Sequence, residues 1–163
     1  MRLTGPQDVY DLGRMAVLRD PIGATINVWQ PKTMHGADVL NEPGSLGWTQ
    51  LNATDPAKAK PFYTGLFGCK AEDMASPGGG STYTTWMKGT EGAGGMMQMP
   101  PGAEAPSHWL VYWSVADTDA AHRKAASLGA KTFVPPTDVP GMVRFTVMQD
   151  PQGVVFALMT PLM

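Results

Sequence analysis

The segment DPQGVVFALMTP, residues 150–161, has a counterpart near the start of the chain, where residues 20–31 read DPIGATINVWQP. A shift of 130 positions aligns residues 6–31 with residues 136–161 without a gap, and nine of the 26 aligned residues coincide. An ungapped internal repeat of this kind indicates a structural unit that is used twice. Residues 1–31 are therefore interpreted as a remnant, the last two strands of a unit whose complete copy comes later.

Composition limits the classes of protein that this chain can belong to. Its 163 residues are enough for one domain with its own core. The net charge is −2, only 16% of residues are charged and no basic run occurs, so nucleic acid and anionic membrane are poor candidate partners. The single cysteine, Cys69, cannot form an internal disulfide. No apolar run approaches the roughly 18 residues of a membrane span, and no signal peptide is recognisable, which predicts a cytoplasmic protein.

Residues 32–45 lack a clear period and are expected to link the remnant to a complete domain at residues 46–163. That domain is read as two halves of the same plan, in which a strand leads to an Asp N-cap, a helix ends at a glycine and three strands follow. The expected elements are strands at 46–53, 69–74, 81–88, 94–99, 108–115, 131–134, 142–149 and 154–159, with helices between Asp55 and Gly68 and between Asp117 and Gly129.

This plan resembles the vicinal oxygen chelate superfamily, which includes glyoxalase I, bleomycin-resistance proteins and extradiol dioxygenases. Four ordered segments carry the resemblance across residues 46–161: DPAKAKPFYTGLFG, SVADTDAAHRKAASLGA, PPTDVPGMVRFTVMQDPQG and VVFALM. It implies an α+β fold, in which two βαβββ modules with curled mixed sheets face each other around a cleft and the helices lie outside. Residues 6–31 resemble the end of a preceding domain, as in tandem glyoxalase-like proteins of the hydroxylase type.

The resemblance also implies four positions for metal ligands, which are usually His, Gln or Glu in this superfamily. The matching residues of this chain are Trp48, Met97, Leu110 and Ala157, and Asn27 stands at the last of these positions in the remnant. Hard and borderline cations require nitrogen or carboxylate-oxygen ligands, which these four residues do not supply. The sequence therefore predicts neither a family-type metal site nor another cofactor.

The alternation of side chains along strands predicts which residues would line the cleft. The expected ligand-binding residues are Trp48, Gln50, Asn52, Met97, His108, Leu110, Tyr112, Arg144, Met148 and Ala157. Phe145, Val147, Phe156 and Leu158 are expected on the opposite side, beneath the helices. A wall of aromatic and thioether groups with a few polar atoms predicts binding of a hydrophobic or aromatic small molecule.

Two other functions remain open at this level. In a metal-free enzyme acting on a carbonyl or aromatic substrate, His108, Tyr112 and Arg144 are the candidate catalytic residues. Arg144 recurs as Arg14, however, which favours a structural role shared by both copies, and Asp20 and Asp150 are expected to cap their turns. In an interaction or structural module, side chains would instead fill the cleft.

The remnant also bears on assembly. Two strands cannot bury an apolar face alone, so residues 13–19 and 24–29 are expected to pack on the main domain or on a second chain. This favours a homodimer, and it leaves open whether the facing sheets come from one chain or are exchanged between two.

Overall fold

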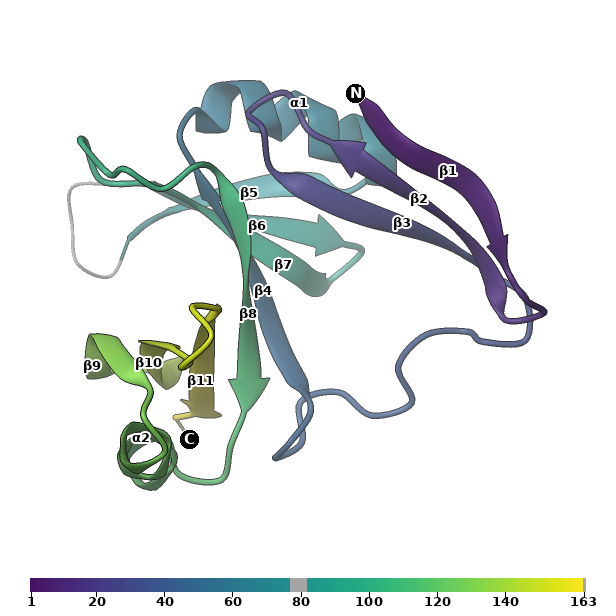
Figure 1. Cartoon of the computed structure of the whole chain (residues 1–163). Coiled ribbons are helices and arrows are strands. Elements are labelled where there is room, and N and C mark those ends of the chain that lie inside the picture. Colours follow the sequence, from purple (N-terminus) through teal and green to yellow (C-terminus); the bar gives the residue numbers. More distant parts are fainter. Residues whose placement is uncertain (77–81, 163) are drawn as a thin grey trace. The chain divides into compact units, whose positions relative to one another are not determined.

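The computed structural model describes residues 1–76 and 82–162 (Figure 1). The strands are β1 (Arg2–Val9), β2 (Gly13–Arg19), β3 (Thr25–Pro31), β4 (Leu46–Ala53), β5 (Lys70–Ala75), β6 (Thr82–Lys88), β7 (Glu91–Gln98), β8 (His108–Ser114), β9 (Lys131–Val139), β10 (Val143–Gln149) and β11 (Val155–Pro161), and the helices are α1 (Pro56–Phe67) and α2 (Thr118–Ser127). Residue 81, where one strand was expected to begin, and residue 163, the expected end of the domain, lie outside the described residues.

The two βαβββ halves are confirmed as β4-α1-β5-β6-β7 and β8-α2-β9-β10-β11. The N-terminal segment has three strands rather than the expected two, because β1 precedes β2 and β3. Likewise β9 continues to Val139, beyond the expected end at residue 134. Both missed pieces contain proline, Pro6 in one and Pro135–Pro136 in the other. Since β1 and β9 are edge strands, a proline there removes no ladder hydrogen bond on the open side.

The chain divides into two compact units. Unit 1 holds the described residues of 1–38, 51–76 and 80–109, and unit 2 holds those of 39–50 and 110–163. Unit 1 contains a three-stranded sheet of order β1-β2-β3 and a second run of paired strands of order β5-β6-β7-β4. In unit 2 the paired strands follow the order β8-β11-β10-β9. β4 and β8 contribute residues to both units.

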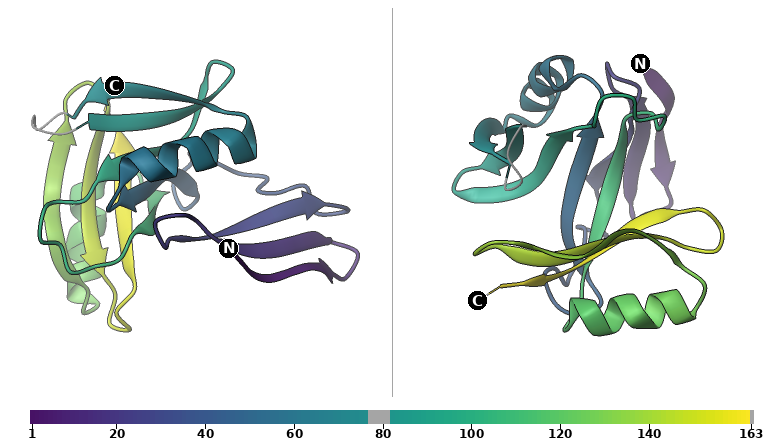
Figure 2. Two further views of the ribbon diagram at one scale, coloured as in Figure 1. Left: turned by 90° about the horizontal axis from the view of Figure 1, so that it is seen from above. Right: turned by 90° about the vertical axis from the view of Figure 1, so that its left-hand side faces the viewer.

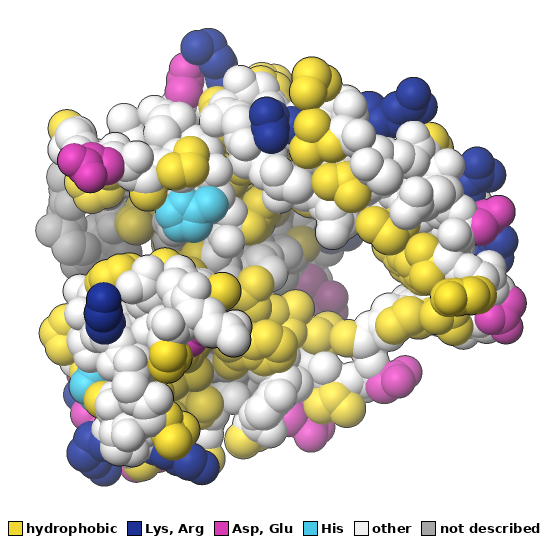
Figure 3. All heavy atoms as spheres, viewed as in Figure 1, with side chains coloured by type: hydrophobic (Ala, Val, Ile, Leu, Met, Phe, Trp, Pro, Cys, Tyr) yellow, Lys and Arg dark blue, Asp and Glu magenta, His cyan; other side chains and the backbone are white. Residues whose placement is uncertain are grey.

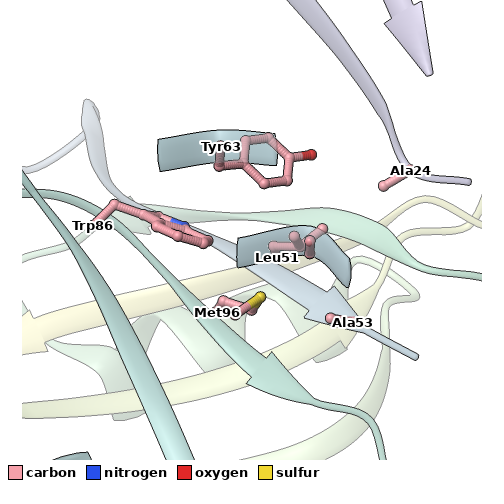
Figure 4. Close-up of a cluster of buried hydrophobic side chains, with 7 residues drawn as sticks. Ala24, Leu51, Ala53, Tyr63, Trp86 and Met96 are labelled. Carbon is pink, nitrogen blue, oxygen red and sulfur yellow. The ribbon is translucent and has the colours of Figure 1, made fainter. Parts of the chain in front are cut away.

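Helix α1 begins and ends where the sequence predicts. The Asp55 carboxylate accepts a hydrogen bond from the Lys58 backbone N–H at 3.2 Å, Pro56 occupies the first turn, and Gly68 ends the helix with φ of 61°. Its buried face carries Ala59 and Tyr63. These side chains pack in one cluster with Ala24, Leu51, Ala53, Trp86 and Met96 (Figure 4). This cluster is the core of unit 1.

A buried carboxylate joins the N-terminal sheet to that core. Asp20 is 5% exposed, and its Oδ1 accepts hydrogen bonds from the backbone N–H groups of Ile22 at 2.9 Å and Ala24 at 2.8 Å. Its Oδ2 accepts a third hydrogen bond, from the Tyr63 hydroxyl at 2.8 Å, and Trp109 Nε1 donates to that hydroxyl at 3.1 Å. Burial and the hydrogen bond to Asp20 raise the pKa of Tyr63, which keeps its hydroxyl a donor. The β2–β3 turn therefore packs on the core of unit 1, which is one of the two arrangements that the sequence left open.

In unit 2, helix α2 lies along one face of β9, β10 and β11 (Figure 2, right). Asp117 caps the helix by accepting from the Ala120 N–H at 2.9 Å. The hydroxyl of Thr118, which is 1% exposed, donates to the Arg144 carbonyl at 3.1 Å. The helix is thus attached to the middle strand of this part of the sheet.

The expected orientation of β10 is wrong by one residue. β10 and β11 are antiparallel, with Phe145 opposite Met159 and Val147 opposite Ala157, and directly opposite residues share a face of the sheet. Phe145 and Val147 therefore lie on the Ala157 side, and Arg144 and Met148 lie on the other side. Both faces of β10 carry apolar residues, so alternation alone does not fix its orientation, and a shift of one residue exchanges the two faces.

No helix among the described residues is long and apolar enough to cross a membrane. On the face shown in Figure 3, the Lys and Arg side chains are scattered among acidic, apolar and uncharged groups rather than gathered in one patch.

Candidate ligand-binding face

A cluster of apolar side chains in unit 2 occupies the sheet face that contains Ala157. At its centre Ala157, Leu110 and Tyr112 are 0%, 4% and 8% exposed. Tyr112 and Ala157 are partners in the parallel pairing of β8 and β11. The surrounding members are only partly buried: Trp48, Phe145, Val147, Val155 and Met159. We call these eight residues the unit 2 apolar face.

Three of the eight residues of the unit 2 apolar face are aromatic: Trp48, Tyr112 and Phe145. The rings of Tyr112 and Phe145 lie 6.1 Å apart, centroid to centroid, with an interplanar angle of 54°. Trp48 packs against the same buried centre from β4. One buried polar contact borders the aromatic groups, in which the Tyr112 hydroxyl donates to Gln50 Oε1 at 3.3 Å. The arrangement offers apolar contact area beside a phenol and a carboxamide, the combination found in small-molecule sites.

Five of the ten expected binding residues lie together here. Trp48, Leu110, Tyr112 and Ala157 belong to the unit 2 apolar face, and Gln50 is bonded to Tyr112. Phe145 and Val147 also belong to this face, although they were expected beneath the helices. The signal that could have found them is the turn at residues 150–153, because a tight turn fixes the register of a hairpin. The observed register places Phe145 opposite Met159 and Val147 opposite Ala157.

Asn52, His108 and Met97 lie in unit 1. Asn52 Nδ2 and His108 Nε2 are 3.0 Å apart, and His108 Nδ1 is 2.8 Å from the Pro106 carbonyl oxygen. Because a carbonyl oxygen only accepts, the neutral imidazole donates from Nδ1 and accepts the Asn52 amide at Nε2. Both ring nitrogens of His108 are therefore engaged. Met97 is partly buried on β7, opposite Tyr83 of β6.

The expectation that Arg144 shares the face of Tyr112 is wrong. Its guanidinium donates to both carboxylate oxygens of Asp119, at 2.6 and 3.0 Å, and to Asp138 at 2.7 Å. Hydrogen bonds to Asp119 and Asp138 raise the pKa of Arg144. The hydrogen bond from Arg144 lowers the pKa of Asp119. Arg144 thus ties α2 and β9 to β10 on the opposite face, which is the structural role that its recurrence as Arg14 favours.

Met148 is also misplaced by the sequence reasoning. It is 0% exposed, and it lies on the α2 side of β10 together with Arg144 and Thr146. Neither Met148 nor Arg144 therefore contributes to the unit 2 apolar face.

The residues at the four expected metal positions do not fit a metal. Trp48, Leu110 and Ala157 pack within one apolar cluster, and the fourth position is Met97 in unit 1. Across residues 1–76 and 82–162, no group of three or more His, Cys, Asp or Glu side chains is placed to hold an ion. These four positions carry an indole, a thioether and two aliphatic side chains, and none of them supplies the imidazole or carboxylate groups that bind hard and borderline cations.

Unit 1 also has an open depression of about 520 Å³ beside the start of α1. Its charged groups already have partners, since Asp55 pairs with Lys58 Nζ at 3.0 Å and Lys60 pairs with Asp73. Lys60 Nζ donates to both oxygens of Asp73, at 2.9 and 2.7 Å, and the Thr84 hydroxyl donates to Asp73 at 2.7 Å. Because these groups already have partners, we do not assign the binding function to this depression.

The model of the Glyoxalase/Bleomycin resistance protein/Dioxygenase superfamily matches residues 45–158. The chain belongs to this superfamily. It is 38% identical over 154 residues to "Putative glyoxylase CFP32" of Mycobacterium bovis, and 39% identical over 154 residues to "Anthracycline biosynthesis protein DauV" of Streptomyces sp. strain C5. Each match covers 94% of this chain but only 58% and 54% of the respective relative. The chain thus spans little more than half the length of these relatives.

Solved structures confirm the fold at low sequence identity. The 2,3-dioxygenase LapB from Pseudomonas sp. KL28 superposes with a TM-score of 0.63 at 15% identity, covering 100% of this chain and 64% of the other. The Mn(II)-bound glyoxalase from Novosphingobium aromaticivorans gives 0.58 at 17% identity, covering 97% and 51%. The resemblance and the α+β class expected from the sequence are both confirmed.

Proposed function

We propose that this glyoxalase-like protein binds a largely apolar small molecule without a metal ion, and that the unit 2 apolar face provides the contacts. One observation carries the proposal. Three residues at the positions expected for metal ligands, Trp48, Leu110 and Ala157, are apolar and pack together around Tyr112. Where the family resemblance implies side chains that bind a cation, this chain has apolar side chains, which favour contact with a hydrophobic group.

The side chains of this face also indicate the type of ligand. Trp48, Tyr112 and Phe145 suit a flat aromatic system, since aromatic rings associate in offset or edge-to-face geometry. Met159 adds a deformable contact that tolerates differences in ligand shape. The Gln50–Tyr112 hydrogen bond places a polar contact beside these rings, which suits a ligand that carries a few oxygen substituents.

The name of one relative agrees with this ligand class. DauV is called an anthracycline biosynthesis protein. Anthracyclines are fused ring systems that contain aromatic rings and carry carbonyl and hydroxyl substituents. We therefore take polycyclic aromatic compounds with a few oxygen substituents as the ligand class.

The contacts of two of the three candidate catalytic residues, His108 and Arg144, favour binding over metal-free catalysis, whereas Tyr112 lies on the unit 2 apolar face with its hydroxyl bonded to Gln50. Both ring nitrogens of His108 are in hydrogen bonds, and Arg144 is held by two carboxylates on the opposite face of its sheet. A general base must reach the proton that it removes, and neither group is placed on the unit 2 apolar face to do so. The homodimer and the cytoplasmic location remain predictions from the sequence.

A binding measurement with matched variants tests this proposal. Titration of an anthracycline into the chain, followed by ligand fluorescence and by Tm, should show saturable binding and a rise in Tm. Trp48→Ala should weaken binding by about tenfold or more, since it removes a large aromatic contact. Trp113→Ala is the control, because Trp113 neighbours Tyr112 on β8 but points to the opposite face and is 44% exposed.

Metal dependence is tested in the same assay. Binding that is unchanged by EDTA, with less than stoichiometric metal in the purified protein, is the expected result. Affinity lost on EDTA treatment and restored by a divalent metal would overturn the metal-independent function. An equal loss of affinity in Trp48→Ala and Trp113→Ala would show that the ligand does not bind at the unit 2 apolar face.

A further inference from the structure

Two buried serines of this chain, Ser107 and Ser114, differ in their hydrogen bonds. They are 4% and 3% exposed. Ser107 Oγ accepts a hydrogen bond from the Thr54 N–H at 3.0 Å and lies 2.8 Å from the Thr54 hydroxyl oxygen. In the part of the chain that the structure describes, no donor or acceptor is hydrogen-bonded to Ser114 Oγ. Buried polar groups are nearly always hydrogen-bonded, so the partner of the Ser114 hydroxyl is to be sought outside the fold.

Ser114 lies at one end of the unit 2 apolar face. It follows Tyr112 by two residues on β8, and residues two apart on a strand point to the same face of the sheet. Its partner in the parallel pairing with β11 is Met159, a member of the unit 2 apolar face. The Ser114 hydroxyl is therefore on the side of the proposed ligand, whereas Trp113 points to the opposite side.

A glycine makes room for this hydroxyl. A Cβ on Gly47 would run into Ser114 Oγ and would lie 3.1 Å from Met159 Sδ, so a larger residue at position 47 would displace both groups. The Ser114 backbone is fixed on both sides, since its N–H donates to the Ser45 carbonyl at 2.9 Å and its carbonyl accepts from the Gly44 N–H at 2.8 Å. The hydroxyl is thus attached to a fixed backbone beside Met159.

The Ser114 hydroxyl also keeps some exposed surface. Among the described residues, Trp86 Nε1 is the one polar side-chain atom that is fully enclosed and has no hydrogen-bond partner. Ser114 Oγ has no partner either, so it is not fully enclosed. Met159 beside it is only partly buried, and its unbranched side chain can turn aside. A ligand on the unit 2 apolar face can therefore reach this hydroxyl.

On the basis of the proposed function, we propose that Ser114 determines ligand specificity, because its hydroxyl binds a carbonyl or hydroxyl oxygen at the edge of the ligand. A serine hydroxyl can donate one hydrogen bond and accept others, so it suits either group. The ligand supplies the partner that the fold does not. A ring system without oxygen leaves the hydroxyl unpaired and binds more weakly for that reason.

The free protein tests whether the Ser114 hydroxyl has a partner in the fold. Ser114→Ala should leave Tm unchanged or raise it by up to about 2 °C, because no hydrogen bond of the fold is lost. Ser107→Ala is the matched control and should lower Tm by about 3 °C, because it leaves the Thr54 N–H without its acceptor. An equal fall of Tm in both variants would overturn the proposal.

Two probes that differ in oxygen content test the specificity. Anthraquinone-2-sulfonate and anthracene-2-sulfonate share three fused rings and the sulfonate, and only the first carries carbonyl oxygens. Isothermal titration calorimetry gives the affinity of each probe for the unchanged chain and for Ser114→Ala. The variant should bind the quinone about fivefold more weakly, through loss of one hydrogen bond, and should bind the anthracene probe with unchanged affinity.

The same titrations distinguish failure of this proposal from failure of the proposed function. If the quinone binds and its affinity falls in Trp48→Ala but not in Ser114→Ala, the role of Ser114 is overturned and the ligand stays on the unit 2 apolar face. An equal loss for both probes in Ser114→Ala would also overturn that role, since it would show lost packing rather than a lost hydrogen bond. If the unchanged chain binds neither probe, the proposed function and the role of Ser114 are both overturned.

Discussion

β2–β3 and β10–β11 have the same bounds and the same pairing, but their side chains meet different surroundings. Asn27 is exposed, whereas Ala157 at the equivalent position is completely buried. The carboxylate of Asp20 is buried and reaches Tyr63, whereas that of Asp150 bonds the N–H groups of its own turn at 2.9 Å. The comparison shows that the strands and turns follow from local sequence, while the role of each side chain follows from what covers it.

The turn carboxylates should show the largest difference between the two copies. Asp20→Ala leaves two backbone donors and the Tyr63 hydroxyl without their acceptor in a buried site, which should lower the free energy of unfolding by about 3 kcal/mol. Asp150→Ala removes only the turn contacts and should cost about 1 kcal/mol. Urea unfolding measures both, and equal losses would show that the link from Asp20 to Tyr63 adds no stability.

Asn27 and Ala157 occupy equivalent positions, and replacing each by the other residue should lower the free energy of unfolding at only one of them. Ala157→Asn places a carboxamide in the buried centre of the unit 2 apolar face and should cost about 2 kcal/mol. The reverse change, Asn27→Ala, is on an exposed position and should stay within about 0.5 kcal/mol. A similar loss in both variants, measured by urea unfolding, would mean that Asn27 is covered by other residues in solution.

The first residue of the strand also differs between the two copies, since β2 begins with Gly13 and β10 with Val143. Gly13 replaces Val143 of the complete copy, and a Cβ at this position would run into the indole of Trp29. Gly13→Val should therefore displace the Trp29 ring, break its hydrogen bond to the Met34 carbonyl and cost about 1 kcal/mol. The Trp29 indole N–H resonance reports the displacement, and an unmoved resonance with unchanged stability would contradict the close packing.

The smallest effect is expected from the arginine pair, and it depends on pH. At about pH 7, Arg144→Ala should lower Tm by about 1.5 °C and Arg14→Ala by less than about 0.5 °C, because Arg144 makes two short ion pairs and Arg14 one long contact. The pKa of Asp119 is lowered by Arg144, so this stabilisation is complete above the usual pKa of a carboxyl group and is lost as the pH falls through the lowered value.

Thermal unfolding of the two Arg144 forms between about pH 7 and pH 2 checks this sign, since their Tm values should converge in acid. A difference in Tm that persists at low pH would show that packing of the Arg144 side chain, rather than its charge, holds α2 on the sheet.

Much of the fold was predictable because its signals are local. The caps at Asp55, Gly68 and Asp117 fixed the helix ends, and the two D-P-x-G turns fixed the hairpins. Of the ten residues predicted to line the cleft, Trp48, Leu110, Tyr112 and Ala157 pack in one cluster, and Gln50 is hydrogen-bonded to Tyr112. Strand β1 and the second half of β9 were missed, since proline argues against a strand unless its position at a sheet edge is known.

The sequence alone determined that the same strand–turn–strand segment occurs twice and that Trp48, Met97, Leu110 and Ala157 stand where the family resemblance implies metal ligands, because both facts depend on residue identity and spacing. Only the tertiary structure decided which face of β10 looks toward Tyr112, because both of its faces can be buried and the choice depends on carboxylates brought by α2 and β9. It likewise decided that Asp20 is buried against Tyr63, a contact between residues 43 positions apart that no local pattern encodes.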